Sequence, residues 1–357
     1  IMIGILLSVL LVIFYFYKAS NKAMYPVQNI ENEVNAIISQ LHLVKKIQPS
    51  SELTRTFIAE LIAENGVEQE LKKLALIQKR MSYRANFLVS VVLNLFAAWD
   101  FLVIHELHKW LDKNASQLAT WEDQLAELEV WVSGAIFKFN HPNSVFAQFS
   151  EHDELQIDEL GHPFVAAEKQ VRNAIQLSTK EHFLIITGPN MAGKSTYLRS
   201  VGLAIISANA GFPILAKNCV LPKYELYSSM RTTDDLTVES SYFHAELTRL
   251  RFIMDAIESG RKTFIILDEI LKGTNSHDKE IGSAKFLQKL HRLGAKGIIA
   301  THDLSLTKLS EGTKVFRNVY FDSTIHENEL SFDYKVREGV CKNMNASFLL
   351  KQMKLVD

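Results

Sequence analysis

Cysteine is nearly absent from this sequence. Only Cys219 and Cys341 occur among 357 residues, and they form no Cys-x-x-Cys pair. A disulfide framework and a cysteine zinc site are therefore not expected. The chain also lacks a surplus of either charge, because 39 Lys and Arg face 40 Asp and Glu. This balance excludes a broadly basic, histone-like nucleic-acid binder and equally an acidic disordered chain.

Glycine and proline are scarce in the first half of the chain. No proline lies between Pro49 and Pro142, and only three of the 15 glycines precede residue 160: Gly4, Gly66 and Gly134. Helix interiors exclude both residue types, whereas phosphate-binding loops and tight turns require glycine. We therefore expect two differently built parts, a helical domain over 18–155 and an α/β domain over 156–357.

Charge is absent from residues 1–17, and two lysines follow within five residues. An uncharged apolar run of 17 residues is just long enough for a helix to span a bilayer. We therefore expect a transmembrane helix here, with a buried core helix as the alternative. The lysines favour a cytoplasmic C-terminal side. A second apolar stretch over 87–104 is interrupted by Asn94 and Asp100, which favours a buried helix over a second span.

A phosphate-binding motif opens the second part. Residues 182–187 are a short apolar run typical of a buried parallel strand, and they lead directly into a GxxxxGK[ST] motif and a helix-compatible run. In that context backbone amides bind phosphates, Lys194 neutralises the β and γ oxygens, and the Ser195 hydroxyl binds Mg²⁺. The predicted binding loop consists of Gly188, Pro189, Asn190, Met191, Ala192, Gly193, Lys194, Ser195 and Thr196.

Two later apolar runs end in polar residues. Residues 263–267 lead into Asp268 and Glu269, and residues 297–300 lead towards His302. The carboxyl ends of strands in an α/β sheet face the ligand crevice. Asp268 is predicted to hold the Mg²⁺ shell, and Glu269 to orient and deprotonate the attacking water. His302 is predicted to sense the γ-phosphate, with a structural histidine as the alternative.

These motifs, in this order, resemble the ATPase domain of the MutS family of DNA mismatch repair proteins. The motif at residues 187–196 is the most specific for this family, because its Asn-Met pair distinguishes the family from generic P-loop ATPases. Residues 161–163 resemble the family's Gly-His-Pro motif, and residues 268–276 resemble its Walker B strand end and following loop. The resemblance covers about 156–357. It implies an α/β P-loop NTPase of the ABC and MutS type, preceded by an all-helical core- and lever-like domain.

The resemblance also implies a homodimer joined through its ATPase domains. Residues 234–236 and 241–243 resemble the segment that replaces the ABC-transporter signature. The serine of that segment reaches the γ-phosphate held by the opposite subunit, so Ser241 is expected to complete a composite site. Such a site would bind ATP and Mg²⁺, and ATP hydrolysis would control DNA binding in mismatch repair or in recognition of DNA structure.

Some features depart from the repair proteins. Leu271 and Lys272 stand where those proteins usually have Gly-Arg, as in a divergent MutS-like branch. The nearest approach to a basic cluster is interpreted as a solvated helix face: Arg249, Arg251, Arg261 and Lys262. The alternative function is therefore a membrane-tethered, nucleotide-dependent switch that binds a protein partner rather than DNA. Its ATPase domain would be cytoplasmic, tethered to a bacterial inner membrane through residues 1–17.

Overall fold

The computed structural model describes residues 15, 24–25, 27, 30–63, 66–230, 242–271, 274–326, 329–342 and 355. The chain forms two compact units, Ile1–Val132 and Ser133–Asp357. Except for Tyr15, the transmembrane helix predicted over 1–17 lies outside the described residues, and so does Ser241.

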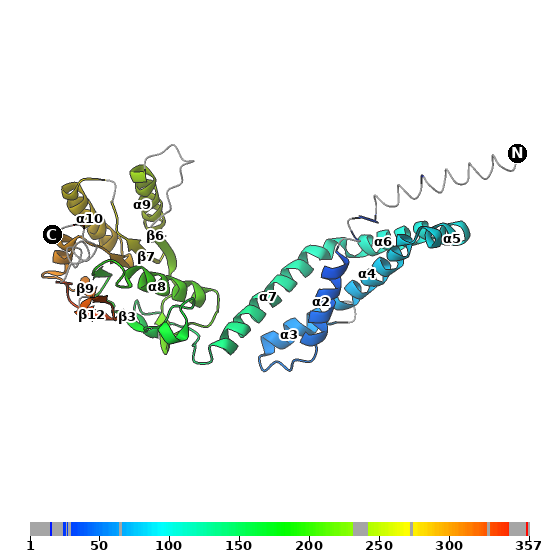
Figure 1. The fold of residues 1–357 in the computed structure, drawn as a ribbon, viewed down its shortest axis with the longest axis horizontal. Coiled ribbons are helices and arrows are strands. Elements are labelled where there is room, and N and C mark those ends of the chain that lie inside the picture. Colours follow the sequence, from blue (N-terminus) through cyan, green and yellow to red (C-terminus); the bar gives the residue numbers. More distant parts are fainter. Residues whose placement is uncertain are drawn as a thin grey trace. The chain divides into compact units, whose positions relative to one another are not determined.

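The described part of the first unit is built from helices (Figure 1). Along α4 the buried apolar residues recur every three or four positions, so one face of the helix packs against its neighbours and the other faces solvent. The helices are α2 (Glu31–Val44), α3 (Glu52–Leu61), α4 (Val67–Ser82), α5 (Phe87–Ala97), α6 (Trp99–Asn114) and α7 (Leu118–Asn140), with 3-10 turns η1 (Tyr83–Ala85) and η2 (Ala115–Gln117). Helix α7 continues into the second unit.

The prediction of one buried helix over 87–104 is wrong. The left-handed residue Ala98, at φ 46°, divides the stretch into α5 and α6. Most of the apolar side chains of α5 are exposed, including Leu88 at 74% and Phe96 at 82%. Among the described residues no single helix is long and apolar enough to cross a membrane. The helical segments Leu88–Ala97 and Trp99–Asn140 are bent by 79° relative to each other. They meet the length and composition criteria for a membrane span only when the two are taken together.

The second unit centres on a six-stranded sheet of order β12-β9-β4-β8-β7-β6, in which only β12 is antiparallel to its neighbour. Strands β4 and β8 are buried along their whole length, as expected for a parallel sheet covered on both faces. The α/β fold class is thereby confirmed. The strands are β4 (Phe183–Thr187), β6 (Glu225–Ser229), β7 (Thr263–Asp268), β8 (Lys296–Ala300), β9 (Phe316–Phe321) and β12 (Val336–Glu338).

Alternate residues of β4 enter different cores. Leu184 and Ile186 pack with α8, whereas Phe183 and Ile185 pack in a cluster with residues of α9 and α10. Helix α8 shares its core with a second sheet of order β1-β5-β2-β3. The remaining elements are β1 (Gln148–Phe149), β2 (Leu155–Leu160), η3 (Ala167–Lys169), β3 (Asn173–Leu177), α8 (Lys194–Asn209), β5 (Asn218–Leu221), α9 (Tyr242–Glu258), α10 (Ser276–Arg292), η4 (Leu304–Ser310), β10 (Thr324–His326) and β11 (Glu329–Ser331).

Candidate nucleotide-binding site

The loop between β4 and α8 has the backbone conformation that its glycines allow. Gly188 has φ 145° and Gly193 has φ 102°, both in the left-handed region that side chains rarely adopt. A Cβ on Gly188 would lie 2.6 Å from the backbone oxygen of Phe321 on β9. The loop therefore lies directly against the neighbouring strand, and residues 183–209 form the strand, loop and helix that the sequence predicts.

Two polar side chains at the start of α8 face chemically distinct partners. The buried Lys194 donates from Nζ to the backbone oxygens of Gly188 and Pro189, both at 2.8 Å. The Ser195 hydroxyl donates to Oδ2 of Asp268 at 2.8 Å, across 73 residues of sequence. The structure therefore brings the predicted phosphate-binding lysine and both predicted Mg²⁺ ligands to one place.

Glu269 follows Asp268 at the end of β7, in an unusual conformation. Its φ is 58°, and its amide donates to the backbone oxygen of Ala300 at 2.9 Å, so the residue is fixed to the end of β8. Its carboxylate is 3.4 Å from Nζ of Lys279 on α10, and both side chains are largely buried. The Glu269 carboxylate therefore lies at the sheet edge where the sequence predicts a general base, and Lys279 of helix α10 holds it there.

The loop after Glu269 is also held by a side chain from helix α9. The amide of Leu271, again left-handed at φ 57°, donates to Oε1 of Glu246 on α9 at 2.6 Å. Glu246 lies three residues beyond the segment 241–243, and its contact with Leu271 could not be predicted from the sequence. Lys272 and Gly273 lie outside the described residues.

His302 is half-buried just beyond β8. The adjacent Thr301 donates its amide to the backbone oxygen of Ile186 at 2.9 Å, which extends the pairing of β8 with β4. Asp303 caps η4 by accepting from the amide of Ser305 at 2.9 Å. His302 is thus placed at the same sheet edge as the phosphate loop and Asp268, because β8 lies between β4 and β7.

A cavity of about 620 Å³ adjoins the loop, and sequence reasoning missed it. Its lining includes Gly193 and Thr196 on one side and the aromatic residues Phe332 and Tyr334 on the other. Asn173 holds this aromatic segment in place, because its side chain donates to the backbone oxygen of Tyr334 and accepts from the amide of Val336. No sequence signal connects residues so far apart.

His162 of the Gly-His-Pro motif also lines this cavity. Burial, with a smaller contribution from the charge of Arg199, lowers the pKa of His162 below its usual value. The imidazole is therefore neutral at physiological pH and can accept a hydrogen bond as well as donate one. One such bond is formed locally, from the amide of Phe164 to Nδ1 of His162 at 3.2 Å.

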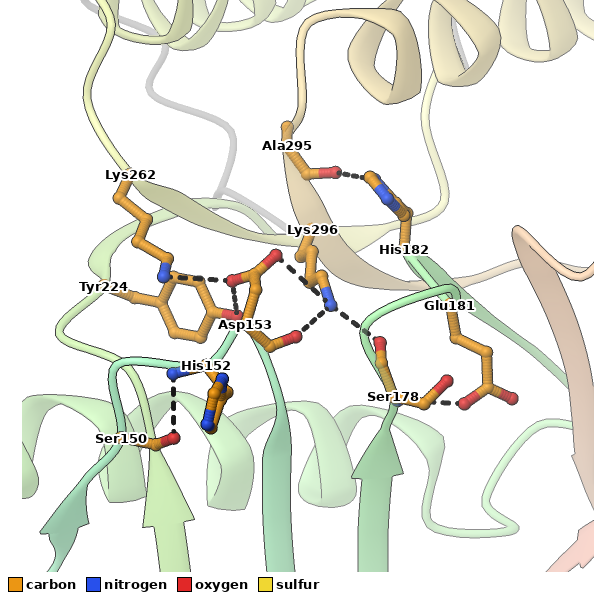
Figure 2. Close-up of polar contacts among 10 residues, drawn as sticks. All are labelled: Ser150, His152, Asp153, Ser178, Glu181, His182, Tyr224, Lys262, Ala295 and Lys296. Atoms are coloured by element: carbon orange, nitrogen blue, oxygen red, sulfur yellow. Dashed lines mark hydrogen bonds and ion pairs between the residues drawn. The ribbon is translucent and has the colours of Figure 1, made fainter.

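A second polar cluster lies at the opposite edge of the main sheet, where β8 begins (Figure 2). The buried Lys296 donates to the backbone oxygens of Asp153 and Ser178 and lies 3.3 Å from Oδ2 of Asp153. Burial lowers the pKa of Lys296, and Asp153 partly offsets this shift. Asp153 also accepts from the hydroxyl of Tyr224 at 2.9 Å. These contacts join the two sheets and lie away from the nucleotide loop.

Comparison with known proteins identifies the region around the loop. The family profile described as MutS domain V matches residues 184–355. The DNA mismatch repair protein MutS of Geobacillus sp. (strain WCH70) is 31% identical over 221 residues, which cover 60% of this chain and 25% of that protein. Its namesake from Thermotoga sp. (strain RQ2) is 30% identical over 233 residues, or 64% of this chain and 29% of that protein. The match therefore spans less than a third of these relatives.

Proposed function

Because this chain belongs to the MutS family, we propose that it binds ATP with Mg²⁺ and hydrolyses the bond to the γ-phosphate. The observation that carries the proposal is the 2.8 Å contact between Ser195 and Asp268 beside the phosphate loop. It joins the helix start to the strand end that supplies Glu269. In this proposal residues 156–357 are the ATPase domain, and residues 18–155 are a helical core- and lever-like domain.

The residues present fit Mg²⁺. The ion prefers one or two protein oxygens, completed by water and substrate phosphates, and Ser195 and Asp268 offer an oxygen each. Within the described ranges no group of three or more His, Cys, Asp or Glu is placed to hold a metal ion. When bound, Mg²⁺ would neutralise charge on the β and γ oxygens.

The chain's own residues would carry out the remaining steps. Lys194 would exchange its contacts with the loop carbonyls for phosphate oxygens. Glu269 would accept the proton of the water that attacks the γ-phosphorus, while the bond to the β-phosphate oxygen breaks and ADP leaves. His302 would contact the γ-phosphate from the end of β8. The cavity lined by Phe332 and Tyr334 would receive the adenine ring, since its walls begin at the phosphate loop.

Hydrolysis by Glu269→Gln tests the proposal. We expect the rate to fall by about 10²–10⁴-fold, because a general base contributes on that order, while binding of a fluorescent ATP analogue persists. Lys194→Ala should lose binding itself. Glu280→Gln on the exposed side of α10 is the matched control and should leave both readouts unchanged. Hydrolysis at the parent rate by Glu269→Gln would refute the assignment of the base.

We also propose that two chains form composite sites, each completed by Ser241 of the opposite subunit. The proposal rests on the resemblance of 241–243 to the family's segment, since Ser241 lies outside the described residues. A mixture of Lys194→Ala chains and Ser241→Ala chains tests it. Each variant alone should be inactive, whereas mixed dimers contain one intact site and should recover activity. No recovery on mixing would contradict a shared site.

Hydrolysis would control binding of DNA, the ligand that the relatives' name, DNA mismatch repair protein, indicates. The cluster of Arg249, Arg251, Arg261 and Lys262 gives this little support. Arg251 is paired with Asp255 and Glu258, and Arg261 is paired with Glu225. A cluster whose charges are paired within the chain contributes little to phosphate binding.

The paired cluster and the exposed apolar helix α5 favour a second candidate, a membrane-tethered switch that binds a protein partner. Binding to duplex, mismatched and branched DNA, titrated with salt in the presence and absence of ATP, separates the two. Binding that weakens with salt supports DNA as the ligand. Absence of binding to all three would leave the switch as the function.

A further inference from the structure

Helix α5 and the first turn of α6 form an apolar tip at one end of the first unit (Figure 1). Its exposed apolar side chains include Leu88, Val89, Val92, Leu95, Phe96, Phe101 and Leu102. Single exposed apolar residues are ordinary, but a contiguous set on two successive helices marks a binding surface.

The tip presents no charge to its surroundings. No charged residue occurs over 85–99. The next residue, Asp100, is 5% exposed, and its Oδ1 lies 3.0 Å from Nε of Arg84, which is 4% exposed. Asn94 is also turned inward, since its Oδ1 accepts from the amide of Asp100 at 2.9 Å. The two polar residues that interrupt the apolar stretch are thus used to close the turn at Ala98.

The base of the tip has the chemistry of a bilayer interface. The half-exposed ring of Tyr83 lies 6.1 Å from that of Trp99, whose indole donates to the backbone oxygen of Arg80. Arg80 forms an ion pair with Glu106 on α6. Going from α5 into the body of the unit, the surface therefore changes from apolar through aromatic to charged. In membrane proteins, Tyr and Trp are enriched at the interface between the apolar core of the bilayer and the aqueous phase.

The base of the tip is also contacted by Met24, which precedes helix α2 along the chain. Met24 is fully buried, and its Sδ accepts from Nη1 of Arg84 at 3.1 Å. Arg84 is the residue that pairs with Asp100 at the base of the tip. Met24, Arg84 and Asp100 therefore form one buried group at the base of the tip.

We propose that the apolar tip inserts into one leaflet of a lipid bilayer. An 11-residue helix is about 16 Å long, roughly half the thickness of the hydrocarbon core, so it reaches into a leaflet without spanning the membrane. The proposal is independent of nucleotide hydrolysis. It supplies a lipid contact that does not require residues 1–17 to span the bilayer.

Flotation of the full chain with phosphatidylcholine vesicles, with and without phosphatidylglycerol, tests insertion. The double variant Leu88→Glu with Phe96→Glu should bind at least about tenfold more weakly, since burying one such side chain is worth about a factor of ten. The matched control is Leu43→Glu with Leu53→Glu, which changes exposed leucines on α2 and α3 and should bind like the parent. Unchanged helicity by circular dichroism and unchanged ATP hydrolysis show that both variants fold.

A label at the tip distinguishes lipid from other occupants. Both native cysteines are buried, so an environment-sensitive dye on Phe96→Cys is selective. Its emission should shift to the blue only when vesicles are added. A blue-shifted dye without vesicles would show that residues 1–17 or a second copy cover the tip, and would overturn the proposal. Equal flotation of the tip variant and the parent, or no flotation of either, would also overturn it.

Discussion

Acid should destabilise the helical unit through buried carboxylates on α4, and Glu70 is the one whose contribution can be worked out. The side chain of Glu70 on α4 is 2% exposed. Its oxygens accept from Lys73 at 2.7 Å, from Lys113 at 2.8 Å and from Asn114 at 3.2 Å. Lys73 lies on α4 itself, whereas Lys113 and Asn114 lie on α6 and join the two helices. Protonation of Glu70 therefore weakens the contact on which the packing of the unit depends.

The magnitude follows from the pKa. Burial by itself would raise the pKa of Glu70, but the hydrogen bonds from the two lysines and Asn114 outweigh it and lower the pKa from 4.5 to about 2. A group whose pKa is lowered by folding stabilises the folded state above its unfolded pKa. That stability is lost as pH falls from 4.5 towards 2. At 1.36 kcal/mol per pKa unit, the contribution at neutral pH is about 3 kcal/mol.

Tryptophan fluorescence during urea unfolding measures this contribution selectively. All four tryptophans lie between Trp99 and Trp131, within the first unit, so their emission reports on that unit alone. The free energy of unfolding falls by about 1–2 kcal/mol per molar urea. We therefore expect Glu70→Gln to lower the urea midpoint at pH 7 by about 2 M. The difference from the parent should shrink as pH falls below 4.5.

The exposed Glu60→Gln on α3 is the control and should follow the parent at every pH. Parallel loss of stability in the parent and in Glu70→Gln between pH 5 and pH 2 would refute the reasoning. It would mean that other carboxylates dominate acid unfolding.

Three further changes probe the second unit. Ser195→Ala removes the hydroxyl that contacts Asp268, so the Mg²⁺ needed to bind a fluorescent ATP analogue should rise about tenfold; an unchanged Mg²⁺ titration would contradict the assignment. Asp153→Ala leaves the buried Lys296 without its counter-charge, which should cost about 3 kcal/mol and lower the thermal midpoint seen by circular dichroism. A midpoint equal to the parent's would show that the carbonyl contacts suffice. Gly188→Ala should abolish nucleotide binding because its Cβ meets Phe321, whereas Gly211→Ala, with no atom within 4 Å, should bind normally.

The strands that carry the site were predictable because their signal is local. Residues predicted as strands over 182–187, 263–267 and 297–300 form β4, β7 and β8 within a residue or two at either end. A strand buried on both faces needs a continuous apolar run, and nothing outside the run decides its type. The strand, loop and helix around Lys194 were predictable for the same reason, because residues adjacent in the sequence determine them.

The environment of α5 and of the cavity could not be predicted in this way. Apolar composition shows that side chains avoid water but not what covers them, so the exposed Phe96 and a buried phenylalanine look alike in sequence. The wall formed by Tyr334 depends on a clamp from Asn173, 161 residues earlier. Contacts of this kind are set by tertiary packing, which a pattern along the chain does not record.

Helix α10 contacts the end of β7, where Glu269 lies, through two of its residues. Lys279 holds the carboxylate of Glu269, and three residues later Gly282 leaves the space that Leu271 fills, because a Cβ there would lie 3.0 Å from Cδ1 of Leu271. Residues three apart share a face of a helix. A rotation of α10 would therefore displace Glu269 and the following loop together. The position of α10 therefore sets the positions of both the Glu269 carboxylate and the Leu271 side chain at the end of β7.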